Sequence, residues 1–583
     1  MTILASAKGK NFEWMKWRAT FQVFTLTEPF TPSQKNAAWQ GNAVLRHPDT
    51  FSAVMEDYAY KNPAMLPADL WDAAYMPVLR ETGTMPVVGD WPRLGQLQMD
   101  GSGTYYEFGS IARGHVSAHG EFFLDLLGEE NCMSDNKSFD LIVIGGGTGG
   151  NGVARMAADA GWKVASIDAL PFGGTCALRG CDPKKMLIAV TEGIDWARNL
   201  SGKGLEAQTS VDWADMIAFK RTFTDAMPGR IEGGLEKAGI TVLHGEARFT
   251  GRDKIEVNGE ILSSRNFHIA TGARPMTLNI PGEELLATST DFLELPERPD
   301  RVVFVGGGFI AMEFAHISKR AGAREVTVLE MMERPLGNFD PDLVGILSEA
   351  TADLGIDLRT EAKVLKIEKD GSDFTVTYKT PEGKQTINCD LVVHATGRVP
   401  NIEHLNLEAA GVEYGRKGIK VSPYMRTTNS AIFAAGDCAD SGPNLTPVSA
   451  NEGRIAGKNL LAGKDERAVS YPPIPSVVFT LPQLSSVGLS EAAARDKGLA
   501  FDTHFEKTAG WYSSLRVGAR YSAYKVLVEN GTGHILGAHL IGPGAEEQIN
   551  LFAMAMGAGL TANRIKGIIF AYPSYASDIS SMV

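Results

Sequence analysis

Two segments of this sequence join an apolar run to a glycine-rich turn and the start of a helix, and no other feature limits the fold as strongly. Residues 139–150 read FDLIVIGGGTGG, and Asp168 closes the next apolar run. Residues 301–311 read RVVFVGGGFIA, and Glu330 closes the apolar run that follows them. In such a unit the glycines permit a tight turn and bring backbone N–H groups to a pyrophosphate, while the acid accepts ribose hydroxyls. The sequence therefore predicts an α/β chain with two Rossmann-like dinucleotide-binding domains.

A cysteine pair lies between these units, in residues 173–185, which read GGTCALRGCDPKK. Cys176 and Cys181 are spaced Cys-x4-Cys at an expected helix start, where the helix N-terminus and the adjacent Lys184 and Lys185 favour the thiolate. Half of a zinc site is the alternative, but a second Cys or His pair does not follow at ligand spacing. The five cysteines of the chain are also too few and too uneven for a disulfide-stapled secreted fold. We therefore expect a catalytic thiol pair in a reducing compartment, and no metal site.

Length and composition exclude several other classes of protein. A chain of 583 residues is too long for one core and should divide into roughly three or four domains. A net charge of -13 argues against a nucleic-acid partner, because phosphate backbones are bound by clustered Lys and Arg. The longest weakly polar stretch, residues 551–560, is half as long as the ~20 residues that a membrane span needs, and residues 1–10 lack the apolar core of a secretory signal. We expect a cytoplasmic protein without a membrane span.

Residues 1–133 differ in character from the rest of the chain. They contain five of the nine tryptophans and no dinucleotide pattern, and their short helical segments are broken by prolines. We expect a separate, mainly helical domain with the tryptophans in its core. His115 and His119 are spaced i, i+4 and could share a helix face, but a third metal ligand is not in view. This domain could bind a protein partner through residues 1–130 or cover the active site.

Taken together, these motifs resemble those of the flavoprotein disulfide reductases with two dinucleotide sites, the class I pyridine nucleotide-disulfide oxidoreductases. Dihydrolipoamide dehydrogenase, glutathione reductase and mercuric reductase are members, and the cysteine segment is similar to their redox-active disulfide. Further family motifs follow in order: ATG at residues 270–272, ATGRVPN at 395–401, AGD at 435–437 and SVVFT at 476–480. The resemblance covers residues 139–583.

This resemblance implies a domain order for residues 139–583. Residues 139–285 and 400–465 would form an FAD-binding domain, and residues 286–399 an NAD(P)-binding domain. Residues 466–583 would form an α+β dimerisation domain, so the protein is expected to be a homodimer. The implied activity passes electrons from NAD(P)H through FAD to the cysteine disulfide and on to a small-molecule acceptor.

The resemblance also implies roles for individual residues. Cys181 would be the thiol next to the flavin, and Cys176 the outer thiol that meets the substrate. Lys185 and Glu313 match the ion pair beside the flavin N5 in this family. The candidate cofactor-binding residues are Gly145, Gly147, Gly150, Asp168, Gly174, Thr175, Lys185, Ala247, Thr271, Gly272, Gly306, Gly308, Glu330, Gly397, Gly436 and Asp437.

The choice between NADH and NADPH depends on Glu330. A carboxylate at this position accepts ribose hydroxyls and repels a 2′-phosphate, so NADH is favoured. Arg334 lies close enough to weaken this preference and leaves NADPH open.

Near the C-terminus the sequence departs from the family. Most disulfide reductases carry His-Pro-Thr-x-x-Glu there, which supplies the catalytic acid–base across the dimer, whereas residues 572–578 read YPSYASD. Tyr572 stands at the His position and Ser577 at the Glu position, with Asp578 one residue later. A tyrosine, with a pKa of about 10, can donate a proton but is a poor base at neutral pH. A packed core aromatic is the alternative role for Tyr572.

The tyrosine at position 572 affects which class of electron acceptor is expected. It favours an acceptor whose leaving group needs little protonation, such as an activated disulfide, a metal ion or another small electrophile, over glutathione or dihydrolipoamide. The two C-terminal cysteines of mercuric reductases are absent from the sequence. Two alternatives stay open: an NADH oxidase or quinone reductase whose electrons leave directly from the flavin, and a redox-sensing scaffold whose N-terminal domain binds another protein.

Overall fold

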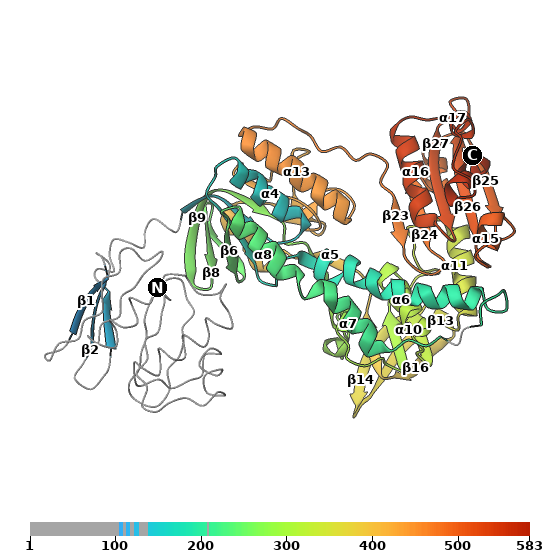
Figure 1. Ribbon diagram of the computed structural model, residues 1–583, viewed down its shortest axis with the longest axis horizontal. Coiled ribbons are helices and arrows are strands. Elements are labelled where there is room, and N and C mark those ends of the chain that lie inside the picture. Colours follow the sequence, from blue (N-terminus) through green and yellow to red (C-terminus); the bar gives the residue numbers. More distant parts are fainter. Residues whose placement is uncertain (1–103, 109–111, 117–121, 127–137, 207–208) are drawn as a thin grey trace, which may run out of the picture. The chain divides into compact units, whose positions relative to one another are not determined.

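The computed structural model describes residues 104–108, 112–116, 122–126, 138–206 and 209–583 of a chain that divides into two units, Met1–Lys137 and Ser138–Val583 (Figure 1). In the first unit, three strands form an antiparallel sheet in the order β1-β2-β3: β1 (Thr104–Phe108), β2 (Ala112–Val116) and β3 (Phe122–Leu126). Aromatic residues, which fit strands well, are frequent in β1 and β3.

These strands correct one prediction for the N-terminal region. His115 lies in strand β2, so the suggestion that it could share a helix face with His119 is wrong. His119, the five tryptophans and the helices expected elsewhere in residues 1–133 lie outside the described residues.

The first strand–glycine turn–helix segment builds a large sheet around β4 (Ser138–Ile144), and Leu141, Ile142 and Val143 of this strand are inaccessible to solvent. Such burial on both faces is typical of parallel strands in α/β domains. Helices α4 (Thr148–Asp159) and α13 (Thr446–Ala462) lie side by side over the sheet, where Gly453 allows close approach to Gly149 (Figure 1). The parallel strands follow the order β6-β5-β4-β9-β21, and β8 and β7 continue from β9 in antiparallel fashion. Their bounds are β5 (Val164–Asp168), β6 (Thr241–His244), β7 (Ala247–Gly251), β8 (Lys254–Val257), β9 (Glu260–Ile269) and β21 (Ile432–Ala434).

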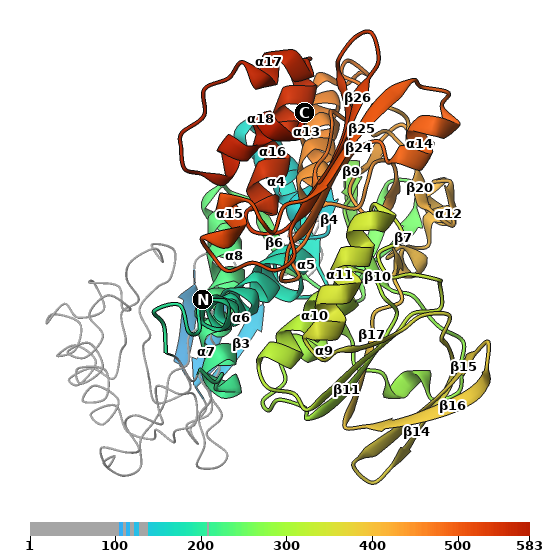
Figure 2. The same ribbon diagram turned by 90° about the vertical axis from the view of Figure 1, so that its right-hand side faces the viewer.

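The second such segment builds a smaller parallel sheet in the order β13-β12-β11-β17. Phe304 of β11 (Arg301–Val305) and Met312 of α10 (Phe309–Arg320) are buried in the core between this sheet and its helices. An antiparallel meander, β14-β15-β16, lies beside the sheet (Figure 2). The other bounds are β12 (Glu325–Leu329), α11 (Pro341–Asp353), β13 (Asp357–Arg359), β14 (Lys363–Asp370), β15 (Asp373–Thr380), β16 (Gly383–Cys389) and β17 (Leu391–His394).

The C-terminal part is an antiparallel sheet in the order β23-β24-β27-β26-β25, packed against α16 (Ala545–Gly557). Phe552 of α16 is fully buried in the core of this layer pair. The bounds are β23 (Ser476–Val478), β24 (Leu484–Gly488), α14 (Glu491–Asp496), β25 (Phe501–Lys507), α15 (Tyr512–Leu515), β26 (Ala523–Glu529), β27 (Ile535–Ile541), α17 (Ala562–Lys566) and α18 (Ile579–Met582).

Four helices connect β5 with β6, namely α5 (Gly174–Arg179), α6 (Cys181–Asn199), α7 (Trp213–Thr224) and α8 (Met227–Lys237). The long helix α6 starts at the cysteine pair and contacts α10 of the second sheet (Figure 1). Within the part of the chain that the structure describes, no helix combines the length and the apolar character needed to cross a bilayer. The short elements that remain are β10 (Ala273–Pro275), α9 (Ser289–Leu293), β18 (Arg398–Pro400), α12 (Leu407–Ala410), β19 (Tyr414–Gly415), β20 (Gly418–Lys420) and β22 (Ala439–Asp440).

Candidate redox site

Cys176 and Cys181 lie at adjoining ends of two consecutive helices. Cys176 is in α5, Cys181 is the first residue of α6, and both thiols are free. Gly180 precedes α6 and offers no side-chain cap, so the unpaired N–H groups of the first turn favour negative charge at Cys181. The hydrogen bond from the Cys176 thiol, together with the charge of Lys184, lowers the pKa of Cys181 to about 6. The same hydrogen bond and burial raise the pKa of Cys176, so the reduced pair carries its charge on Cys181 and its proton on Cys176.

A buried carboxylate, Glu313 of α10, holds two lysines beside the cysteine helix. Glu313 Oε2 lies 2.9 Å from Lys184 Nζ and 3.0 Å from Lys185 Nζ. Burial alone would raise the pKa of Glu313, but the two ammonium groups outweigh burial and keep this pKa below its usual value. Burial lowers the pKa of Lys185 to about 8. The structure thus brings Lys185 and Glu313 together as predicted, and it adds Lys184, which the sequence indicated only as a charge near the thiols.

Thr446, the first residue of α13, is a neighbour of the cysteines that the sequence analysis missed. Its Oγ1 lies 3.9 Å from Cys181 Sγ. Hydrogen bonding to the charged form of a group stabilises that form, and this contact also lowers the pKa of Cys181. The only signal in the sequence is that Thr446 follows soon after the AGD motif of residues 435–437.

The residues predicted to bind FAD meet at one edge of the first sheet. Gly145 follows β4, Asp168 ends β5, Thr271 follows β9 and Gly436 follows β21. Parallel strands bring their carboxyl ends to the same edge, which is where α/β proteins bind ligands. Ala247 follows the end of β6 and is buried at the start of β7. The other predicted residues in the turns and helix starts around this edge are Gly147, Gly150, Gly174, Thr175, Gly272 and Asp437.

The turn after β4 is shaped for a phosphate rather than for a side chain. Gly145 has φ +113°, and a Cβ there would lie 2.2 Å from Ala270 O. Gly174 has φ +67°, and a Cβ on it would lie 2.7 Å from Gly147 Cα. The first turn of α4 has no side-chain cap, and in the part of the chain described here the buried Asn151 Oδ1 has no hydrogen-bond partner. These residues therefore fit the pyrophosphate of a bound dinucleotide at the N-terminus of α4.

Two carboxylates stabilise the turns of this edge. The Gly146 N–H donates to Asp168 Oδ2 at 2.7 Å, which ties the glycine turn to the end of β5. Glu452 of α13, which the sequence analysis missed, accepts the N–H of Gly436 at 2.8 Å and the Tyr471 hydroxyl at 2.6 Å. Burial raises the pKa of Asp437, the residue after this turn.

The second parallel sheet has glycine turns and an acidic residue at positions equivalent to those of the first sheet. Gly306 follows β11, Gly308 precedes α10, and Gly397 lies beyond the end of β17. Gly306 has φ +102°, and a Cβ there would lie 2.6 Å from Ala395 O. Glu330 follows β12, and its carboxylate accepts the N–H of Gly307 at 2.5 Å.

The loop after Glu330 bears on the choice of nucleotide. Arg334 donates to the carbonyl oxygens of Leu336 at 3.3 Å, Phe339 at 3.1 Å and Gly337 at 2.8 Å. Its guanidinium therefore donates to carbonyl oxygens within its own loop.

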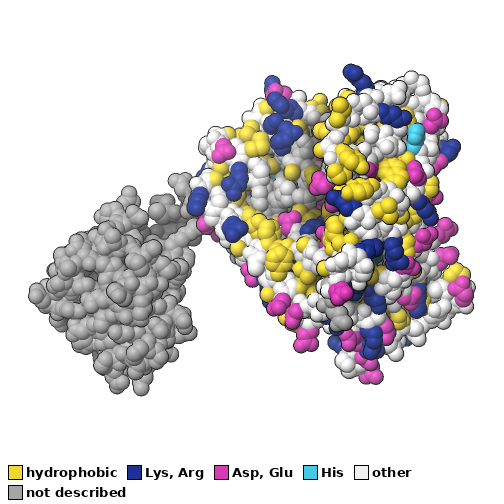
Figure 3. Space-filling model, turned by 45° about the vertical axis from the view of Figure 1, so that its right-hand side comes forward, with side chains coloured by type: hydrophobic (Ala, Val, Ile, Leu, Met, Phe, Trp, Pro, Cys, Tyr) yellow, Lys and Arg dark blue, Asp and Glu magenta, His cyan; other side chains and the backbone are white. Residues whose placement is uncertain are grey.

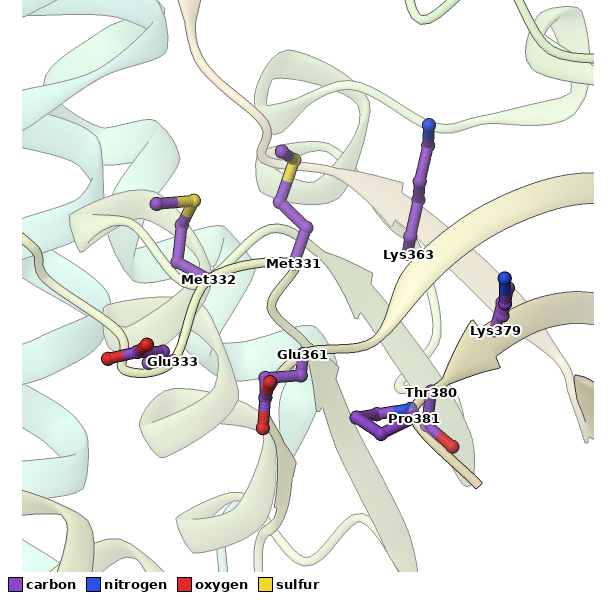
Figure 4. Close-up of a pocket in the computed structure, with 8 residues that line it drawn as sticks. All are labelled: Met331, Met332, Glu333, Glu361, Lys363, Lys379, Thr380 and Pro381. Atoms are coloured by element: carbon purple, nitrogen blue, oxygen red, sulfur yellow. The ribbon is translucent and has the colours of Figure 1, made fainter. Parts of the chain in front are cut away.

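A pocket of about 390 Å³ lies next to this loop (Figure 4). Met331 and Met332, the residues directly after Glu330, line one side, and Lys363 of β14 and Lys379 of β15 line the other. The pocket thus begins at the residue that follows Glu330 in the chain, while Glu330 itself does not line it.

Tyr572 is not packed in the core of its own chain. Its side chain is 78% exposed, and its ring stacks on that of Tyr512 with centroids 6.4 Å apart and planes inclined by 29°. Ser577 donates to Ser574 O within its own turn at 2.6 Å, and burial raises the pKa of Asp578. Among the described residues, no hydrogen bond or ring contact joins Tyr572 to either cysteine of the same chain.

Family models match both the part of the chain that contains the two parallel sheets and the C-terminal part. Residues 139–453 match the family model described as pyridine nucleotide-disulphide oxidoreductase, and residues 474–583 match the dimerisation domain of that family. A glutathione reductase of Burkholderia cepacia is 35% identical over 450 residues, which cover 76% of this chain and 98% of that protein. A mercuric reductase of Staphylococcus aureus is 33% identical, with 77% of this chain and 83% of that protein covered. A dihydrolipoyl dehydrogenase of Thermus scotoductus is also 33% identical, with 76% and 96% covered.

Solved structures agree with these sequence relatives. The HOCl-induced flavoprotein disulfide reductase RclA from Escherichia coli superposes with a TM-score of 0.69 at 28% identity, covering 76% of this chain and 99% of that one. A Cu(II) complex of the same protein also gives a TM-score of 0.69, at 27% identity, covering 76% of this chain and 98% of that one.

Proposed function

The chain belongs to the pyridine nucleotide-disulphide oxidoreductase family, whose enzymes use FAD and NAD(P)H, and we propose that it passes electrons through a Cys176–Cys181 disulfide to an activated disulfide or an oxidising metal ion. The observation that carries this proposal is the position of the two thiols at adjoining helix ends, beside the Lys184–Lys185–Glu313 cluster. A thiol pair that is regenerated by a nicotinamide nucleotide works in a reducing compartment, so we propose a cytoplasmic location.

Bound FAD supplies two-electron transfer between the nicotinamide and the disulfide, and the side chains of this chain control the charges around it. The residues of the α4 N-terminus would hold its pyrophosphate, and Asp168 its ribose. On reduction, the helix N-terminus and the lysines stabilise Cys181 as the thiolate, while Cys176 keeps the proton.

With a disulfide acceptor the thiol chemistry balances in two steps. Cys176 gives up its proton to solvent and attacks one sulfur of the acceptor, so a mixed disulfide forms as the S–S bond of the acceptor breaks and one thiolate leaves. The Cys181 thiolate then attacks Cys176 Sγ, which releases the second thiolate and restores the internal disulfide. Two electrons have then moved to the acceptor, and its two thiolates take up protons according to their own pKa values.

Tyr572 supports an acceptor with a good leaving group. A tyrosine hydroxyl can donate a proton, but it does not replace the histidine base of most relatives at neutral pH. Among the described residues no group of three or more His, Cys, Asp or Glu side chains could hold a metal ion. A metal-ion substrate is considered because the related RclA has been solved as a Cu(II) complex.

We further propose that two chains form a homodimer through the C-terminal domain, so that Tyr572 of each reaches the cysteines of the other. The face around Tyr572 carries large apolar side chains that a single chain leaves exposed, and Ile569 is 98% accessible. Hydrophobic side chains also gather on the face of the molecule seen in Figure 3. The other exposed apolar residues of this domain include Tyr512, Leu515, Met554 and Ile568. A patch of this kind on a soluble protein marks an interaction surface.

NADH is the proposed electron donor. Glu330 accepts N–H groups of the loops around it and has lone pairs left for ribose hydroxyls, and the pocket beside it can take the adenosine half of the nucleotide. Arg334 donates to carbonyl oxygens of its own loop, which leaves fewer of its N–H groups for a 2′-phosphate.

The test is an anaerobic titration of the purified flavoprotein with NADH and, separately, with NADPH. A long-wavelength charge-transfer band at two electrons per subunit is expected, because the Cys181 thiolate then lies against oxidised FAD. Cys176→Ser should bind FAD and lose turnover of disulfides and Cu(II). Direct bleaching of the flavin without such a band, with turnover kept in Cys176→Ser, would instead establish an oxidase or quinone reductase.

A further inference from the structure

Phe479 is a residue of the C-terminal domain that reaches the redox site of its own chain. It follows β23 and belongs to the SVVFT motif of residues 476–480. The Lys185 Nζ lies 3.5 Å from the centre of the Phe479 ring. At this distance the negative face of the ring attracts the ammonium group directly.

The backbone of Phe479 contacts the same ion cluster. Its N–H donates to Glu313 Oε1 at 3.1 Å, while the other carboxylate oxygen, Oε2, takes both lysines. One residue thus binds the carboxylate through its N–H and the ammonium through its ring. Val478, the preceding residue, pairs with Leu484 in the sheet, and the partly buried Phe479 side chain packs against the core that includes Val478 and Leu484.

We propose that Phe479 is a positioning residue of the redox centre, whose ring holds the Lys185 ammonium against Glu313 and so keeps Cys181 as a thiolate in the reduced enzyme. This inference rests on the proposed function, since it assigns a role within the same cysteine relay. It also gives the C-terminal domain a part in the redox chemistry of its own subunit, in addition to dimerisation.

The charges that face Cys181 make this effect measurable. On its own helix these are Asp182, Lys184 and Lys185; from α5 there is Cys176, and from α10 Glu313. The α13 helix contributes only the neutral Thr446 hydroxyl among these contacts. A lysine that is partly withdrawn from water depends on its few partners to stay charged and in place. Replacing the ring by an aliphatic side chain removes one of these partners without adding a charge.

The experiment compares four variants of the full-length holoenzyme with the wild type. Phe479→Leu and Phe479→Met remove the ring, Phe479→Tyr keeps it, and Phe505→Leu is the matched control. Phe505 is in the same domain and also lies near a lysine, with Lys525 Nζ 5.8 Å from its ring centre, but on β25, away from the cysteines. The readout is the pH midpoint of the charge-transfer absorbance after reduction with two electrons per subunit. FAD content and dimer size are checked for each protein.

We expect the midpoint to rise by about 0.3–0.5 pH unit in Phe479→Leu and Phe479→Met, and by no more than in a variant without the Lys185 charge, because the thiolate loses part of its support from Lys185. Phe479→Tyr and Phe505→Leu should keep the wild-type midpoint. If a variant without the ring folds with FAD and keeps the wild-type midpoint, Phe479 does not have the proposed role. The proposed electron transfer through Cys176 and Cys181 would not be affected by that result. Absence of the band from the wild type would overturn the relay itself, and this inference with it.

Discussion

At the scale of single residues, two consecutive lysines act on one carboxylate. Neighbouring positions on a helix do not face each other, so the sequence alone favours one partner for Glu313. In the structure both side chains reach Glu313 Oε2, Lys184 from the buried side and Lys185 from the more open side. The charge of Lys184 also lowers the pKa of Cys181 more than the charge of Lys185 does. The thiolate is therefore expected to depend more on Lys184 than on the predicted partner, Lys185.

This dependence can be measured with Lys184→Met and Lys185→Met. The wild-type Cys181 has a pKa lowered to about 6, so its thiolate is present above that pH and is lost as the pH falls through it. Removing the Lys184 charge should raise the midpoint of the charge-transfer absorbance by about 1 pH unit, since an opposite charge at this range shifts a pKa by about that amount or more. Lys185→Met should raise it by less. Equal shifts, or a larger shift in Lys185→Met, would contradict the greater weight given to Lys184.

At the scale of secondary-structure elements, the sequence predicted the features formed by consecutive residues. It missed the residues that reach the site from segments far away in the chain. A buried strand, a glycine turn and a helix start are consecutive in the chain, so both sheets and both glycine turns followed from residues 139–150 and 301–311. Thr446, Glu452 and Phe479 reach the site from separate segments, and no periodicity indicates where such segments meet. The three strands of the N-terminal region were missed because short aromatic runs broken by glycines carry little periodicity of either kind.

The end of β12 yields a prediction about nucleotide preference. In Glu330→Ala the ribose hydroxyls lose a charged acceptor, and the N–H of Gly307 becomes free to meet a phosphate. We expect kcat/KM for NADH to fall by roughly 10- to 100-fold, and the preference over NADPH to shrink or reverse, because a hydrogen bond to a charged group is worth about 1.5–3 kcal/mol. The measurement is steady-state kinetics with both nucleotides.

Glu333→Ala is the control for that prediction, since Glu333 is exposed and lines the same pocket. It should leave the ratio of the two kcat/KM values close to that of the wild type. If Glu330→Ala also leaves this ratio unchanged, Glu330 does not select the nucleotide.

At the scale of the whole molecule, a buried ion cluster joins the second parallel sheet to the C-terminal domain. Lys525 of β26 lies 2.9 Å from Asp340, which caps α11, and also contacts Asp342 and Glu491. The side chains of Lys525 and Asp340 are almost completely inaccessible to solvent. Truncating one member of such a pair leaves the other charge buried and uncompensated.

Lys525→Met should therefore destabilise the protein by about 3–5 kcal/mol, seen as a lower thermal midpoint and faster proteolysis. Lys420→Met, which breaks an exposed pair with Glu413, should leave both measurements near the wild-type values. A thermal midpoint of Lys525→Met equal to that of Lys420→Met would show that the cluster does not hold the two parts together.

The dimer itself can be tested by complementation between two defective chains. A Cys176→Ser chain lacks the outer thiol, and a Tyr572→Phe chain keeps its ring stack on Tyr512 but lacks the hydroxyl. If Tyr572 serves the cysteines of the partner, a mixed dimer contains one complete site, built from Cys176 of one chain and Tyr572 of the other.

Random mixing makes half of the dimers mixed, so about a quarter of all sites become complete in a two-fold symmetric dimer. Co-refolded or co-expressed chains should then regain about a quarter of wild-type disulfide turnover, beyond the residual activity of Tyr572→Phe alone. Activity that merely averages the two parents would mean that Tyr572 acts within its own chain or not at all, because no mixed site would then gain what its parents lack.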